Sequence, residues 1–179
     1  MKRKSLLVAA ILMASIATNA QSASKNTKDP AQTEKRVTRL LEGKDVSPQS
    51  VSQFSVDFGK TSNAKWTRNK NFDEVTFIKN NNHSTAFYDA NSKLVGTTSI
   101  SSFAKLPAKA QKEIDEKYKG YKKNGVIFYD DNEKNDTDMV LYSTPFDDSD
   151  SYFVELAKNN NKIVLQVDPK GKVALFAKE

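Results

Sequence analysis

The sequence predicts an α+β domain with helices and an antiparallel β-sheet. Two segments have the spacing of amphipathic helices, and nine short segments alternate apolar and polar residues as strands do. Polar turns of Asn, Asp, Pro and Gly join several of these segments, which favours antiparallel hairpins because parallel neighbours need long crossovers. With 179 residues the chain is long enough for a substantial core.

The N-terminal segment has the pattern of a secretory signal peptide. Basic residues at positions 2–4 precede an apolar run over 6–17, and small residues around Ala20 suit cleavage. The apolar run is shorter than the roughly 20 residues that a membrane-spanning helix needs. We therefore expect residues 1–20 to be removed, no membrane anchor, and a periplasmic or secreted protein.

Composition excludes several classes of function. The chain has no cysteine and one histidine, which excludes disulfides, Cys-ligated metals and multi-histidine metal sites. Loss of residues 1–20 removes three basic and no acidic side chains, so the net charge falls from +6 to +3. A net charge this small offers no support for nucleic acid or an anionic surface as a partner.

Residues 21–46 are expected to form a polar N-terminal tail, and residues 47–179 the folded domain. Within the tail, the segment from Pro30 to Gly43 has the start, apolar spacing and stop of a short helix. In the domain, Ser47 and Pro48 suit a helix start and Gly59 a helix stop. A second helix is expected over 107–119. The apolar stripes of these two helices are Val51, Phe54 and Phe58, and Ala110, Ile114 and Tyr118.

The expected strands lie between and after the two helices. They are residues 65–70, 74–79, 84–89, 93–100, 126–130, 139–143, 152–157, 162–168 and 172–177.

An internal similarity suggests two tandem repeats, each a helix followed by a meander. A shift of 79 residues lays 75–94 on 154–173, with seven of the twenty positions identical. Both copies contain a Lys-Asn-Asn-Asn loop and an Asp-x-x-x-Lys turn. Chance similarity between two hairpins with the same turn chemistry is the alternative.

The order of these elements resembles the PepSY-like, β-lactamase-inhibitor-protein-like (BLIP-like) domains of small secreted bacterial proteins. The resemblance rests on Asn63-Ala64-Lys65-Trp66, on Ala86-Phe87-Tyr88-Asp89 and on Leu106-Pro107 leading into the second helix. It implies helices on one face of a curved antiparallel sheet, export to the periplasm, and a binding or inhibitory module. One departure from the pattern is a long acidic insert between Asn124 and Asp150.

No catalytic residue, cofactor or metal is assigned. His83 follows three asparagines in a turn signature, and no nucleophile elbow, phosphate loop or metal-binding helix motif is present. We therefore expect a protein that is not an enzyme.

The alternative function is a calcium- or small-molecule-responsive envelope protein acting through the acidic residues of 130–150. Oxygen-rich loops suit calcium. However, the segment from Asp130 to Lys134 lacks the loop glycine and has a lysine at a position where a ligand is needed.

The sheet face away from the helices is the predicted binding surface. Strand alternation sends Thr76, Ile78, Thr85 and Phe87 to that face. Phe87, Phe153 and Phe176 would be large rings there, of the kind that anchor interfaces, and Trp66 is a fourth candidate that suits either face. A second core under a covering element is the competing interpretation. The expected partner is a protein or small ligand of the cell envelope.

Overall fold

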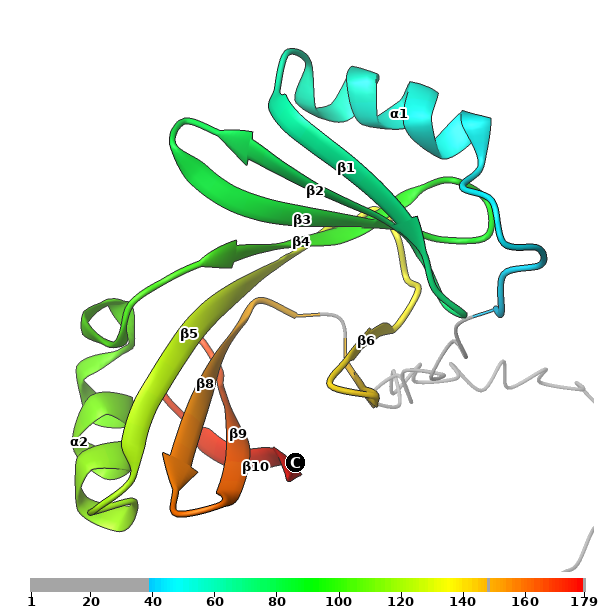
Figure 1. Ribbon diagram of the computed structural model, residues 1–179. Coiled ribbons are helices and arrows are strands. Elements are labelled where there is room, and N and C mark those ends of the chain that lie inside the picture. The colour runs from blue at the N-terminus through cyan, green and yellow to red at the C-terminus, as the bar shows by residue number, and fades with distance from the viewer. Residues whose placement is uncertain (1–38, 148, 179) are drawn as a thin grey trace, which may run out of the picture. The chain divides into compact units, whose positions relative to one another are not determined.

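The computed structural model describes residues 39–147 and 149–178, which contain two α-helices and an eight-stranded antiparallel sheet. Neighbouring strands follow the order β1-β2-β3-β4-β5-β8-β9-β10 (Figure 1). Their bounds are β1 Ser62–Arg68, β2 Asp73–Lys79, β3 Asn82–Tyr88, β4 Leu94–Ile100, β5 Lys122–Asp131, β8 Ser151–Lys158, β9 Asn161–Val167 and β10 Val173–Lys178. The helices are α1 (Pro48–Phe58) and α2 (Ala108–Lys117), with a 3-10 turn η1 (Phe103–Lys105) before α2. A separate hairpin consists of β6 (Met139–Leu141) and β7 (Thr144–Phe146).

The start and stop of α1 are those that the sequence predicts. The Ser47 side chain accepts a hydrogen bond from the Gln49 amide, and Pro48 occupies the first turn, where its missing N–H costs nothing. Gly59 ends the helix at a φ of 64°, a conformation that glycine adopts without steric cost.

Both helices pack on the same face of the sheet. Phe54 of α1 lies in a cluster with Val75, Phe77, Ala86 and Tyr88 of β2 and β3. Residues Ala110 and Ile114 of α2 lie in a second cluster, whose strand residues are Val126, Val154, Leu156, Leu165 and Val167. Cross-strand register connects the two clusters on one face, since Ala86 is opposite Thr97 and Thr97 is opposite Asp130 of β5. Figure 1 shows the sheet curving, with the helices outside the curve and β6 inside it.

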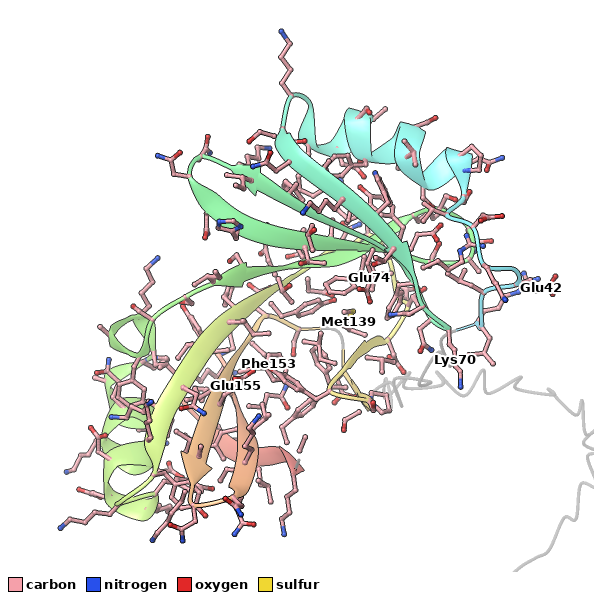
Figure 2. The ribbon with its side chains drawn as sticks, viewed as in Figure 1. Glu42, Lys70, Glu74, Met139, Phe153 and Glu155 are labelled. Carbon is pink, nitrogen blue, oxygen red and sulfur yellow. The ribbon has the colours of Figure 1, made fainter. Side chains whose placement is uncertain are left out.

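The β6–β7 hairpin covers part of the opposite, inner face. Met139 and Phe146 of the hairpin form a third cluster with residues of the main sheet, namely Phe72, Phe87, Val95, Tyr129, Phe153 and Val164. Figure 2 shows Met139 and Phe153 on this inner side. The hairpin turns at Tyr142 and Ser143, both at positive φ. The expected strand 139–143 is therefore β6 followed by a turn at 142–143, and β7 at 144–146 was not predicted from the sequence.

The two halves share turn geometry as well as element order. The Asp89 carboxylate accepts the Lys93 amide at 3.0 Å, and the Asp168 carboxylate accepts the Lys172 amide at 2.9 Å. Residues Ser92 and Gly171 both have positive φ at the corresponding position. Each half runs helix and then four strands of the main sheet, with the β6–β7 hairpin inserted in the second. The tandem repeat itself stays a prediction.

The prediction of a short helix between Pro30 and Gly43 is wrong for residues 39–43, which are not helical. The earlier residues of that segment lie outside the described part of the chain. The Leu41 amide donates to the Lys70 carbonyl at 2.8 Å, and the Glu42 carbonyl accepts from Arg68 at 2.8 Å. These backbone groups are therefore bonded to the β1–β2 hairpin and not to a turn of their own.

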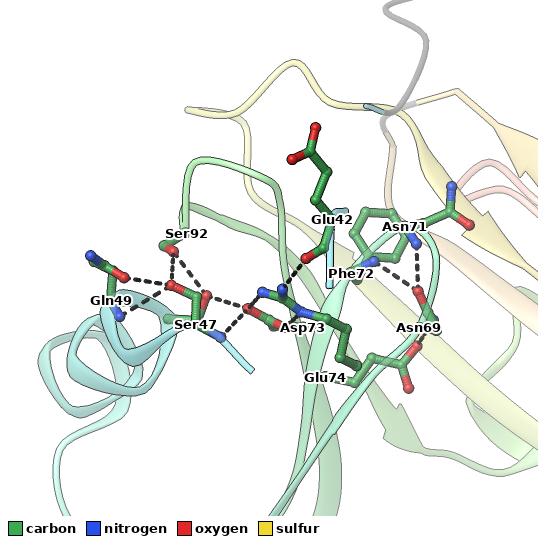
Figure 3. A network of polar contacts seen from close by, with 11 residues as sticks. Glu42, Ser47, Gln49, Asn69, Asn71, Phe72, Asp73, Glu74 and Ser92 are labelled. Atoms are coloured by element: carbon green, nitrogen blue, oxygen red, sulfur yellow. Dashed lines mark hydrogen bonds and ion pairs between the residues drawn. The ribbon is translucent and has the colours of Figure 1, made fainter. Parts of the chain in front are cut away.

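A buried ion pair connects this segment, α1 and the β1–β2 hairpin (Figure 3). Arg68 donates two hydrogen bonds to the Asp73 carboxylate, at 2.6 and 2.8 Å. The same carboxylate accepts from the Ser47 amide and the Ser50 hydroxyl. Asp73 is fully buried. Four donors on one buried carboxylate indicate a structural role for this network.

Substitution of Gly96 in β4 by alanine is expected to lower the free energy of unfolding by about 1–3 kcal/mol, the usual effect of overpacking a core. A Cβ atom at this position would lie 2.5 Å from the Tyr129 hydroxyl oxygen and 2.7 Å from the Asp130 carbonyl oxygen. Urea denaturation measures the change. Gly125→Ala is the control, because its Cβ would meet only the Glu155 carboxylate at 3.8 Å. Equal effects of the two substitutions would contradict this explanation.

Candidate binding surface

The predicted aromatic binding surface is largely buried. Phe153 is 0% exposed and Phe87 5% exposed, so the expectation that these rings are open to a partner is wrong. Phe176 is half-buried and packs on Phe146 and Phe153, with ring centres 5.6 and 4.8 Å apart. The physical reason is the β6–β7 hairpin, whose apolar residues cover the rings. This part of the inner face is therefore a second core, which was the competing interpretation of these rings.

Trp66 lies on the helix side of the sheet. Its ring packs against Phe54 of α1 at 5.6 Å between centres and against Tyr88 at 5.9 Å. It is half-buried in the cluster under α1, so it is not on the predicted binding face.

Beside the hairpin cluster, the inner face continues over β1 to β5, and Ile127 of β5 packs at the edge of that cluster. Lys65 is the register partner of Thr76, Thr76 of Thr85, and Thr85 of Thr98. These partners form one row across four strands, with side chains on the same face. Ile78 lies opposite His83 in the next row, and Ile100 lies opposite Ile127 of β5. We call these residues the threonine surface: Lys65, Thr76, Ile78, His83, Thr85, Thr98, Ile100 and Ile127.

The threonine surface contains two adjoining shallow depressions. One of about 370 Å³ is lined by Asn63, Lys65, Thr76, Phe77, Ile78 and His83. The other, of about 250 Å³, is lined by Thr76, His83, Ser84, Thr85, Thr98, Ser99, Ile100 and Ile127. Thr76 and His83 belong to both, so the two depressions form one continuous surface.

This surface combines exposed apolar groups with hydroxyls. Ile100 is 60% exposed, and its register partner Ile127 is half-buried. Each threonine offers a methyl group and a hydroxyl that both donates and accepts hydrogen bonds. The lining residues include Lys65 and His83 and no carboxylate. The surface can therefore bury apolar area, form hydrogen bonds and attract negative charge.

The nearest acid on the same face is Glu74, one row from the threonine row. It is the register partner of Phe87, and its carboxylate accepts a hydrogen bond from the Asn69 side chain. Burial raises the pKa of Glu74.

Strand alternation had already placed Thr76, Ile78 and Thr85 on this face. The rings were the predicted anchors because aromatic residues are enriched at the centres of interfaces, and no pattern in the sequence indicates the covering hairpin. His83 is exposed, as expected, but it lies in β3 opposite Ile78 and not in the turn that the three asparagines predict. Among the described residues, no hydrogen bond joins it to a serine or a carboxylate, and nothing in this geometry assigns it a catalytic role.

The charges of several acidic residues between 130 and 150 affect one another. Burial raises the pKa of Asp130, and the charges of Asp150 and Glu133 raise it further. Asp150 also accepts a hydrogen bond from the Asp131 amide at 2.9 Å. Within residues 39–147 and 149–178, no group of three His, Cys, Asp or Glu side chains is arranged to hold a metal ion. The calcium alternative stays a prediction from composition.

No family model matches the sequence, and no curated protein matches it. Solved structures do match. A BLIP-like protein from Bacteroides fragilis gives a TM-score of 0.55 at 15% identity, over 75% of this chain and 86% of that chain. A "putative periplasmic" protein from Bacteroides eggerthii gives 0.60 at 12% identity, over 75% and 88%. A DUF2874 family protein from Bacteroides uniformis gives 0.60 at 11% identity, over 75% and 89%.

These matches establish the class of fold. The chain has a BLIP-like α+β fold dominated by an open antiparallel sheet, which confirms that part of the expected resemblance. The PepSY-like part of the resemblance stays a prediction. No helix in the described part of the chain is long and apolar enough to cross a membrane. The signal peptide lies outside the described residues, so its cleavage also stays a prediction.

Proposed function

We propose that this protein is an exported, non-catalytic module that binds another protein through the threonine surface. The observation that carries the proposal is the exposed Thr76 and the half-buried Thr85 beside the exposed Ile100, with Thr98 buried at the end of the row, on a sheet face that is covered elsewhere. Methyl groups and isoleucine side chains supply buried apolar area, and the hydroxyls supply directional hydrogen bonds.

The shape of the surface favours a protein over a small molecule. A small-molecule site encloses most of its ligand. Here two shallow depressions extend over strands from β1 to β5, which suits the broad contact of a protein loop or strand. Because Lys65 and His83 are present and no carboxylate lines the depressions, the partner segment is expected to be neutral or acidic.

The test captures partners from a cell-envelope extract on three immobilised proteins, each shown to be folded. These are the wild type, a Thr85→Arg/Ile100→Glu double variant, and a Val56→Glu control. Val56 is 77% exposed on α1, away from the threonine surface, so its substitution adds one charge without touching the proposed site.

We expect a partner that the wild type and the control retain and that the double variant binds at least about tenfold more weakly, since charge at the centre of an apolar contact disrupts it. Retention of the same proteins by all three, or of none by the wild type, would count against the threonine surface. Circular dichroism and thermal melts establish that the variants are folded.

A further inference from the structure

The small net charge of the chain conceals an uneven distribution of charge. Six lysines gather where α2 ends, β5 begins and the β8–β9 hairpin turns. We call this group the lysine end: Lys117, Lys119, Lys122, Lys123, Lys158 and Lys162. In Figure 2, nitrogen-tipped side chains surround this lower end of the sheet.

Strand register and contacts bring these lysines together. Lys122 of β5 is opposite Ala157 of β8, and Ala157 is opposite Lys162 of β9, so two lysines flank one small residue on the same face. The Lys158 ammonium lies 5.6 Å from the centre of the Tyr121 ring, on the other side of the strand pair. The cations therefore surround the end of the sheet on both faces.

Most of this charge is not neutralised locally. Lys117 pairs with Glu113 at 2.8 Å, and Lys123 pairs with Asp115 at 2.5 Å. Lys119, Lys122, Lys158 and Lys162 are exposed, and among the described residues none of the four has a carboxylate within 4.0 Å in an ion pair. The same end contains a half-buried pair of tyrosines, Tyr118 and Tyr121, with ring centres 5.9 Å apart.

The acidic residues lie toward the other end of the same strand. β5 begins at Lys122 and ends at Asp131, and Asp130, Glu133 and Asp150 are near enough for their charges to interact. Ten strand residues span roughly 30 Å, several times the Debye length of about 8 Å at physiological salt. The two ends therefore act on their surroundings as separate poles of opposite charge.

We propose that the lysine end docks reversibly on an anionic, phosphate-bearing lipid surface. Lysine ammoniums are point charges on flexible stems, and here they are spread over several elements, which suits a diffuse layer of headgroups more than a single bidentate anion. Tyrosine is one of the two residues enriched at membrane interfaces, and the half-buried Tyr118 and Tyr121, which pack against the core under α2, lie among these lysines. Repulsion of the acidic pole orients the domain with its lysine end toward the lipid. This inference does not depend on the threonine surface.

The test measures partitioning onto phosphatidylcholine vesicles with and without phosphatidylglycerol, at low and high salt. The protein is used as the expressing cells export and process it, with its N-terminus read by mass spectrometry. The variant replaces Lys119, Lys122, Lys158 and Lys162 by glutamine. The matched control replaces four exposed lysines elsewhere, Lys44, Lys60, Lys70 and Lys93, so both proteins lose the same charge.

We expect the wild type and the control to sediment with the anionic vesicles and to be released by salt. Each lysine near an anionic leaflet strengthens partitioning by about fivefold, so the lysine-end variant should lose at least about tenfold. Equal loss in the control, or equal binding to neutral vesicles, would overturn the proposal. Equally tight binding to a single-stranded oligonucleotide would assign the lysine end to polyanions in general and overturn the lipid assignment.

Discussion

Asp73→Ala is expected to lower the free energy of unfolding by about 3–5 kcal/mol, the usual cost of removing one partner from a buried ion pair. The substitution leaves the Arg68 guanidinium, whose side chain is 11% exposed, without its carboxylate. It also removes the acceptor of the Ser47 amide and the Ser50 hydroxyl, which hold the start of α1. Urea denaturation at neutral pH measures the loss.

The same network predicts how stability depends on pH. Burial by itself would raise the pKa of Asp73, but hydrogen bonds from Arg68, Ser47 and Ser50 and the charge of Arg68 outweigh it and hold the pKa below 3.8. A carboxyl with a lowered folded-state pKa stabilises the fold above its unfolded pKa, and this contribution disappears as pH falls through the folded value. The difference between wild type and Asp73→Ala should be constant near neutrality and shrink below about pH 4.

Asp115→Ala is the control for both measurements. Asp115 also pairs with a cation, Lys123, but its side chain is 56% exposed, and exposed pairs contribute about 0–1 kcal/mol. If Asp73→Ala costs no more than Asp115→Ala, the buried network does not anchor α1.

Phe153→Ala is expected to lower the free energy of unfolding by about 3–5 kcal/mol, the range for large aromatic residues in a core. The Phe153 ring is fully buried at the centre of the inner cluster, with the rings of Phe146, Phe176 and Tyr142 around it at 5.1, 4.8 and 6.4 Å. Its removal opens a cavity between β8 and the β6–β7 hairpin. Thermal and urea denaturation measure the effect.

Ile100→Ala is the matched control, because Ile100 is a large apolar residue on the same face but is 60% exposed. We expect a change within about 0.5 kcal/mol for this substitution. Similar losses for the two variants would contradict the division of the inner face into a covered core and an open surface. A binding test that replaces Phe153 would report on unfolding, whereas Thr85 and Ile100 report on recognition.

Interactions between residues close in sequence account for the features that were predicted correctly. Ser47, Pro48 and Gly59 specify the ends of α1 whatever it packs against, because capping depends on a few neighbouring residues. The Asp89 and Asp168 turns likewise form through hydrogen bonds to amides four residues ahead. Alternation along β2 and β3 then separates Val75 and Phe77, under α1, from Thr76 and Ile78 on the open face.

Contacts between segments distant in sequence account for the features that were not predicted. Backbone groups of Leu41 and Glu42 are bonded to Lys70 and Arg68 of the β1–β2 hairpin, and residues 39–43 are not helical despite the apolar spacing before Gly43. The β6–β7 hairpin packs on rings from both halves of the sheet, and no local pattern shows where a hairpin of three-residue strands will lie.

By itself the sequence determined the α+β class, the ends of α1, the Asp89 and Asp168 turns and the faces of β2 and β3, because these follow from periodicity and short-range hydrogen bonds. Only the tertiary structure decided that Phe87 and Phe153 belong to a core, that Thr76 and Ile100 stay exposed, and that lysines remote in sequence meet at one end. Those outcomes depend on which surfaces long-range packing buries, and burial is a property of the assembled fold.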